Sequence, residues 1–119
     1  MKKILFILFF SLLTSTSVNA AITIKDWLKV KAGEDIVMKR LHDKLVFSAF
    51  TGLMAINVEL DKKKFCQPSD LKINEQMTEA ILDAGILRFK EIGVPQDEMD
   101  EFPVGFVLLD QLKVMFPCR

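Results

Sequence analysis

The spacing of apolar residues predicts a long helix between Glu34 and Leu60. Apolar and small side chains recur there at steps of three and four residues, which places them on one helix face. The residues of this predicted core stripe are Ile36, Val37, Leu41, Leu45, Ala49, Gly52, Ile56 and Leu60. Four large side chains widen the stripe, namely Phe47, Phe50, Leu53 and Met54. We therefore expect much of this helix to be buried.

A second long helix is predicted from Ile73 or Asn74 to Ile92. Gly93 suits the position after a helix end, and Pro95 cannot continue a helix. One face carries Ile73, Met77, Ile81, Ala84 and either Leu87 or Arg88, and beside it lie Leu82, Gly85, Phe89 and Ile92.

Two shorter helices are predicted, one before and one after the two long helices. Thr23 is a favourable N-cap for a helix from Ile24 to Lys31, which Gly33 ends. Trp27 is expected to anchor this helix on the rest of the domain. Pro103 suits the first turn of the last helix. The apolar face of that helix carries Val104, Val107, Leu108, Leu112 and Met115.

These patterns predict an all-α fold, because no strand-like alternation and no internal repeat occurs in the sequence. We expect a single domain over residues 21–119, built as a compact bundle of about four helices. A domain of about 100 residues buries a modest share of its surface, so a covalent cross-link would matter to its stability.

The first twenty residues have the pattern of a secretory signal peptide. Lys2 and Lys3 precede an uncharged apolar run over residues 4–13, and Val18 and Ala20 are small residues before the expected cut. The apolar run is shorter than the roughly 20 residues that span a bilayer. We therefore predict a periplasmic protein, cleaved after Ala20, with Ala21 as the second choice, and not held in the membrane afterwards. An uncleaved membrane anchor is the alternative.

The chain has two cysteines, Cys66 and Cys118, and each follows or precedes a residue that ends a helix. An even cysteine count in an exported chain favours a disulfide. The closed loop of about 50 residues would contribute roughly 4 kcal/mol in the chain-entropy model. Two free buried thiols are the alternative. A zinc site is not expected, because the two cysteines and His42 fall one ligand short.

Charge and motifs exclude several function classes. Without Lys2 and Lys3 the chain has 14 basic residues against 16 acidic ones, whereas nucleic-acid binding requires a basic face. No nucleophile elbow, phosphate-binding loop, zinc-protease motif or dinucleotide fingerprint occurs. We therefore expect neither an enzyme nor a cofactor, and the remaining class is a small exported binding protein.

The stretch from Gln96 to Phe102 is the most acidic part of the chain. It is either a solvated connecting loop or a protruding recognition loop, since binding residues gather on loops that a rigid scaffold holds. In the second case Met99 and Phe102 would be apolar anchors for a partner. The candidate partner-binding residues are Asp97, Glu98, Met99, Asp100, Glu101 and Phe102.

The first long helix also carries small residues where another helix could approach closely. Ala49 and Gly52 are the candidate dimer-interface residues, because Gly52 in a helix interior costs up to about 1 kcal/mol and a packing role would explain it. The helix is apolar on more than one face, which favours a homodimer.

Several short motifs together resemble a known family. They are Ser48-Ala49-Phe50-Thr51-Gly52, Phe65-Cys66-Gln67-Pro68, a following long helix with Gln76, and Leu112 to Cys118 with its closing Phe-Pro-Cys. The chain is similar to the periplasmic immunity proteins that protect bacteria from type VI secretion amidase effectors. Many members have another cysteine near Ser48 or an aromatic residue after the glycine, where this chain has Leu53.

The resemblance implies a compact helical protein, often a homodimer, that occludes the active-site cleft of a peptidoglycan amidase. Two other functions fit an exported, disulfide-linked helical domain. One is a periplasmic chaperone of the acid-stress type, which would expose apolar surface when its 16 acidic side chains are neutralised. The other is a secreted structural or adaptor domain.

Overall fold

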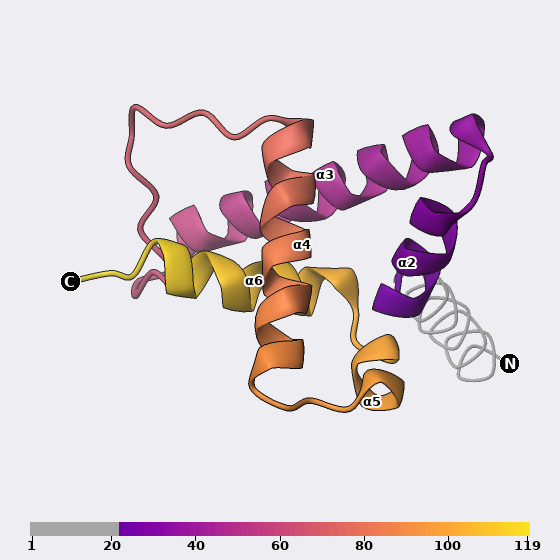
Figure 1. Cartoon of the computed structure of the whole chain (residues 1–119). Helices are drawn as coiled ribbons and strands as arrows, with labels where there is room; N and C mark the ends of the chain where they lie inside the picture. Colours follow the sequence, from indigo (N-terminus) through magenta and orange to yellow (C-terminus); the bar gives the residue numbers. More distant parts are fainter. Residues whose placement is uncertain (1–21) are drawn as a thin grey trace, which may run out of the picture.

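A computed structural model of the chain describes residues 22–119. Within that range it contains five helices and no β-strand, so the predicted all-α fold is confirmed (Figure 1). The helices are α2 (Ile24–Ala32), α3 (Ile36–Glu59), α4 (Glu75–Glu91), α5 (Gln96–Asp100) and α6 (Val104–Met115). The predicted signal peptide lies outside the described residues.

The helix ends follow the local chemistry of the sequence. Thr23 and Asp26 form a reciprocal capping box at the start of α2. The Asp35 carboxylate accepts backbone N–H bonds at the start of α3, and the Asn74 side chain does so at the start of α4. Gly93, with φ of 92°, follows the end of α4 in the left-handed region that glycine adopts easily. The predicted boundaries of the long helices are therefore correct to within two residues.

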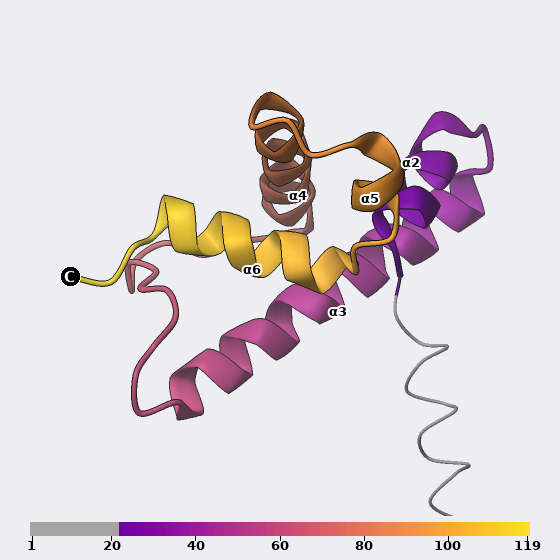
Figure 2. The same ribbon diagram turned by 90° about the horizontal axis from the view of Figure 1, so that it is seen from below.

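Three helices form two layers: α4 lies across α3 and α6 and packs on both of them, and α3 also packs against α6 (Figures 1 and 2). Gly85 makes the contact between α4 and α6 close. A Cβ atom at Gly85 would lie 2.8 Å from Cγ1 of Val107 and 3.2 Å from Cβ of Gln111. The glycine thus allows α4 to approach α6 more closely than any other residue would.

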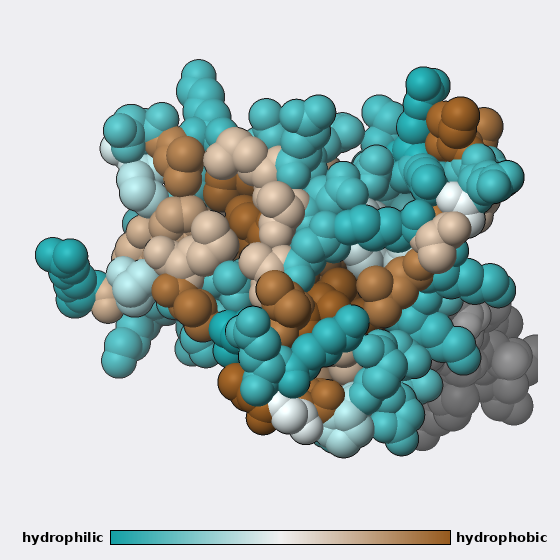
Figure 3. Space-filling view, viewed as in Figure 1, coloured by the Kyte–Doolittle hydropathy of each residue, from teal (hydrophilic) through white to brown (hydrophobic). Residues whose placement is uncertain are grey.

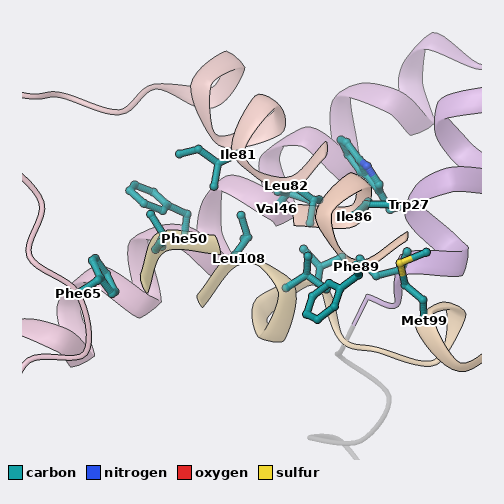
Figure 4. Packing of buried hydrophobic residues seen from close by; sticks show 14 residues of the cluster. Trp27, Val46, Phe50, Phe65, Ile81, Leu82, Ile86, Phe89, Met99 and Leu108 are labelled. Atoms are coloured by element: carbon teal, nitrogen blue, oxygen red, sulfur yellow. The ribbon is translucent and has the colours of Figure 1, made fainter. Parts of the chain in front are cut away.

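The core lies where these layers meet, and α2 closes one end of it (Figure 4). Trp27 is buried there, which confirms its expected role as an anchor. The fully buried side chains include Ile24, Phe65, Leu82, Met99, Val107, Leu108 and Leu112.

The segment between α3 and α4 is held at one point by polar and covalent bonds. The buried Asn57 side chain accepts hydrogen bonds from the backbone N–H of Lys64 and Phe65 and donates one to the Phe65 carbonyl. Phe65 fills the core at that point. The next residue, Cys66, forms the predicted disulfide with Cys118, and its N–H donates to the Phe116 carbonyl.

The predicted core stripe of the first long helix is wrong. Val46, Phe50 and Asn57 are the buried residues of α3. Most of the predicted stripe faces outward instead, because α4 and α6 pack on the other side of the helix. The exposed members are Ile36, Val37, Leu41, Leu45, Gly52, Ile56 and Leu60.

Smaller corrections apply to α4 and α6. Ala84, Leu87 and Ile92 are exposed, because α6 packs against the side of α4 that carries Thr78, Leu82, Gly85 and Phe89. Met115, predicted to lie in the core, is exposed in the last turn of α6.

Candidate protein-interaction surfaces

The acidic segment, residues 96–102, is fixed to its scaffold. It forms the short helix α5 where a loop was predicted. The Phe102 carbonyl accepts a 2.9 Å bond from the N–H of Ile24, and the N–H of Val104 donates a 2.8 Å bond to the Ile22 carbonyl. These bonds join the end of the acidic segment to the start of α2, so the position of the segment is set before any partner binds.

The carboxylates of the acidic segment point mainly into solvent. Asp97, Glu98 and Glu101 are exposed, and Asp100 is half-buried and accepts a 2.7 Å bond from the Gln96 side chain. Four acidic side chains within five residues give this part of the surface a local negative charge, which favours a basic partner surface.

The prediction that Met99 is an exposed anchor is wrong. Its side chain is 0 % exposed and lies at the end of the core that also holds Trp27 and Phe89 (Figure 4). The buried Met99 side chain therefore anchors α5 to the core, and in this conformation it is not available to contact a partner.

An aromatic cluster lies beside the acidic segment. The rings of Phe89, Phe102 and Phe106 have centroid separations of 5.2 to 6.2 Å, in edge-to-face and stacked arrangements. Phe102 is half-buried in the cluster, and Phe106 is 49 % exposed. Apolar side chains also reach the surface near the lower end of α4, where the chain turns toward α5 (Figure 3).

Phe106 was missed as a binding candidate in the sequence. It lies on the side of α6 away from Val104, Val107 and Leu108, together with Lys113. The sequence signal that could have identified it is a phenylalanine on the polar face of an amphipathic helix, where an exposed apolar side chain is expected.

A second surface is the outer face of α3, defined by Val37, Leu41, Leu45, Ser48, Gly52, Ala55 and Ile56, all exposed. No charged residue occurs between positions 45 and 58. The two predicted dimer-interface residues belong here: Gly52 is exposed, and Ala49 is half-buried at the edge of the face. A Cβ atom at Gly52 would meet no described heavy atom within 4 Å, so packing within residues 22–119 gives no reason for this glycine.

An apolar pocket of about 240 Å³ opens beside this face. It lies between α3 and the start of α6. Its lining residues are Ile22, Leu45, Val46, Ala49, Pro103, Val104 and Gly105. The pocket is thus continuous with the outer face of α3 through Leu45 and Ala49.

An ion-pair cluster ties α2 to α4. Lys31 pairs with Asp83 and lies 3.8 Å from a carboxylate oxygen of Glu79, and the Trp27 indole donates a 3.4 Å bond to Asp83. Partial burial, then the nearby Asp43 carboxylate and to a lesser extent Asp83, raise the pKa of Glu79, while Lys31 opposes the shift. The cluster has a structural role in holding α2.

Among residues 22–119, no group of three or more His, Cys, Asp or Glu side chains is arranged to hold a metal ion. In the same range no helix combines the length and apolar character needed to cross a bilayer.

Comparisons with known proteins identified no relative of the chain. No protein-family model matches the chain, and searches of curated proteins and of solved structures found no match either.

Proposed function

We propose that this protein is a periplasmic immunity protein that binds a peptidoglycan amidase effector and occludes its active-site cleft. The observation that carries the proposal is the acidic segment, fixed to α2 at its end and flanked by Phe102 and the half-exposed Phe106. The motif resemblance supplies the class of partner.

The acidic segment has properties that suit an inhibitory contact. Its position is set by backbone hydrogen bonds and by the buried Met99, which lowers the entropic cost of binding. Phe106 offers an apolar anchor in place of Met99, and interface energy concentrates on a few such side chains. The carboxylates attract a basic cleft rim and raise the association rate. Occluding a cleft requires only occupancy, so no catalytic group is needed.

The test uses a peptidoglycan amidase encoded beside the gene for this chain. We expect the purified chain to inhibit it, and Phe106→Ser to weaken binding at least tenfold, about 1.4 kcal/mol. A triple variant, Asp97→Asn/Glu98→Gln/Glu101→Gln, should bind more slowly and respond less to added salt, because screening acts on the charges it removes.

A matched control makes the same three charge changes elsewhere. Glu34→Gln/Asp61→Asn/Asp70→Asn alters exposed carboxylates outside the acidic segment and should bind as the wild type does. Circular dichroism establishes that each variant is folded. Absence of an amidase gene beside this one, or failure of the wild type to inhibit the enzyme, overturns the proposed function. If the two triple variants bind equally well, the amidase binds at a surface other than the acidic segment.

The alternative of an acid-stress chaperone stays a prediction. The proposal above is preferred because the acidic segment is fixed in place and exposed in the folded protein, so binding requires no acid-induced unfolding.

A further inference from the structure

We propose that the pocket between α2, α3 and α4 binds a small free amino acid, with Asp43 and Glu79 holding its ammonium group and Lys39 its carboxylate. In this arrangement the side chain of the amino acid lies against Trp27 and Val30. The inference concerns a small-molecule site and does not depend on the amidase as partner.

The pocket is a cavity of about 260 Å³ where the three helices meet. A cavity of about 150 Å³ holds a benzene molecule, so this one is large enough for a small amino acid. A few charged side chains that converge beside an apolar wall are typical of small-molecule sites. The lining residues are Trp27, Val30 and Lys31 of α2, Lys39 and Asp43 of α3, and Glu79 of α4.

Lys39 and Asp43 place opposite charges next to each other in the pocket. They are four residues apart in α3, so their side chains lie on one face of the helix, about 6 Å apart along its axis. Both are half-buried, and neither forms an ion pair with any residue in the range 22–119. An amino acid carries an ammonium group and a carboxylate on one carbon atom, so a single molecule can contact both side chains.

Glu79 adds a second carboxylate for the ammonium group. Partial burial and then the nearby Asp43 raise the pKa of Glu79, so the two carboxylates repel each other across the pocket. Lys31 lowers this pKa, but it also pairs with Asp83, whose carboxylate raises the pKa of Glu79 further. An ammonium group between Asp43 and Glu79 offsets the repulsion, whereas a ligand with only a negative charge is repelled by both.

Trp27 gives the pocket an apolar wall and a spectroscopic probe. The indole donates a 3.4 Å hydrogen bond to Asp83, and the side chain is buried in the core. The wall is therefore formed before a ligand binds, which lowers the entropic cost of binding. Trp27 is the only tryptophan of the chain, so the tryptophan fluorescence reports on this pocket alone.

Three related compounds test the two charge contacts in the wild-type protein. Leucine has both charged groups, isoamylamine lacks the carboxylate, and isocaproate lacks the ammonium group. We expect leucine to produce a saturable change in fluorescence, with a dissociation constant of about 1 mM or tighter. Isoamylamine should bind at least tenfold more weakly, and isocaproate should not bind. Isothermal titration calorimetry checks that the change in fluorescence reports binding.

Two variants then assign the contacts to side chains. Lys39→Gln should weaken leucine binding at least tenfold without weakening isoamylamine binding, because it removes only the contact to the carboxylate. Asp43→Asn should weaken the binding of both compounds. Lys44→Gln and Asp61→Asn are the matched controls, since both positions are exposed and lie outside the pocket, and they should bind leucine as the wild type does. Circular dichroism establishes that each variant is folded.

Three results would overturn the inference. The first is a wild type whose fluorescence shows no saturable response to leucine at about 10 mM, ten times the expected dissociation constant. The second is binding of either analogue as tightly as leucine, and the third is an equal effect of Lys39→Gln and Lys44→Gln. None of these results bears on inhibition of the amidase, so the proposed function and the amino-acid site fail or stand separately.

Discussion

Glu79 is the residue whose ionisation the fold disfavours. Its carboxylate is partly buried between α3 and α4, near Asp43 and Asp83, and Lys31 compensates only in part. The pKa in the folded protein therefore lies above the ordinary value of 4.5. Because folding favours the protonated form, the contribution of Glu79 to stability rises as the pH falls through the interval between these two values.

Glu79→Gln should accordingly make the protein more stable than the wild type at neutral pH. The amide keeps the size of the side chain and removes the repulsion from Asp43 and Asp83, while Lys31 keeps its pair with Asp83. The difference should disappear below pH 4.5, where the wild-type carboxyl is protonated as well. Urea unfolding of the wild type and Glu79→Gln, at neutral pH and below pH 4.5, measures this difference in stability. Asp61→Asn, in an exposed loop, serves as the control, and a less stable Glu79→Gln at neutral pH would show that the Lys31 pair outweighs the repulsion.

At the scale of the elements, the contact between α4 and α6 depends on Gly85. This contact joins the two helices that bury most of the core residues of the C-terminal half. The available space is set by the branched side chain of Val107 and by Cβ of Gln111, neither of which is the mobile end of a long side chain. A methyl group at Gly85 therefore requires the two helices to move apart.

Gly85→Ala should lower the free energy of unfolding by about 1–3 kcal/mol, the usual cost of overpacking a core. Gly105→Ala, in α6, is the matched control, because its Cβ would meet no described heavy atom within 4 Å. That variant should be neutral or slightly stabilising, since alanine is the better helix former. Urea unfolding measures the stability of both variants, and an unchanged m-value shows that the difference is one of stability. Equal stabilities would mean that α4 and α6 do not approach closely at Gly85.

At the scale of the whole molecule, the disulfide connects the exit of α3 to the end of α6 across 52 positions of sequence. Cys66 and Cys118 are both exposed. Their replacement by serine leaves no cavity in the core, so any loss of stability reports on the cross-link itself.

The double variant Cys66→Ser/Cys118→Ser should lose about 2–5 kcal/mol of stability. Reduction of the wild type should produce the same loss, which controls for the serine side chains. Mass spectrometry after alkylation without reduction should first find no labelled thiol in the native protein. Two labelled cysteines would contradict the disulfide, and an undiminished stability would mean that the cross-link constrains the unfolded chain little.

The sequence by itself determined the four longer helices, their ends and the cross-link, whereas α5 was predicted to be a loop. Helix ends depend on contacts within a few residues, such as the hydrogen bonds of Thr23, Asp35 and Asn74 and the backbone freedom of Gly93. The disulfide followed from there being only two cysteines, in a chain expected to be exported. These features can be predicted with little information about contacts between residues that are far apart in the sequence.

Only the tertiary structure decided which apolar residues are buried. α3 is apolar around most of its circumference, so its periodicity fits more than one core face, and the packing of α4 and α6 selects Val46 and Phe50. α5 has five residues, too few to define a face, and Met99 is buried because α2 packs against that turn. Both candidate surfaces consist of what this packing leaves uncovered, which depends on contacts between residues far apart in the chain.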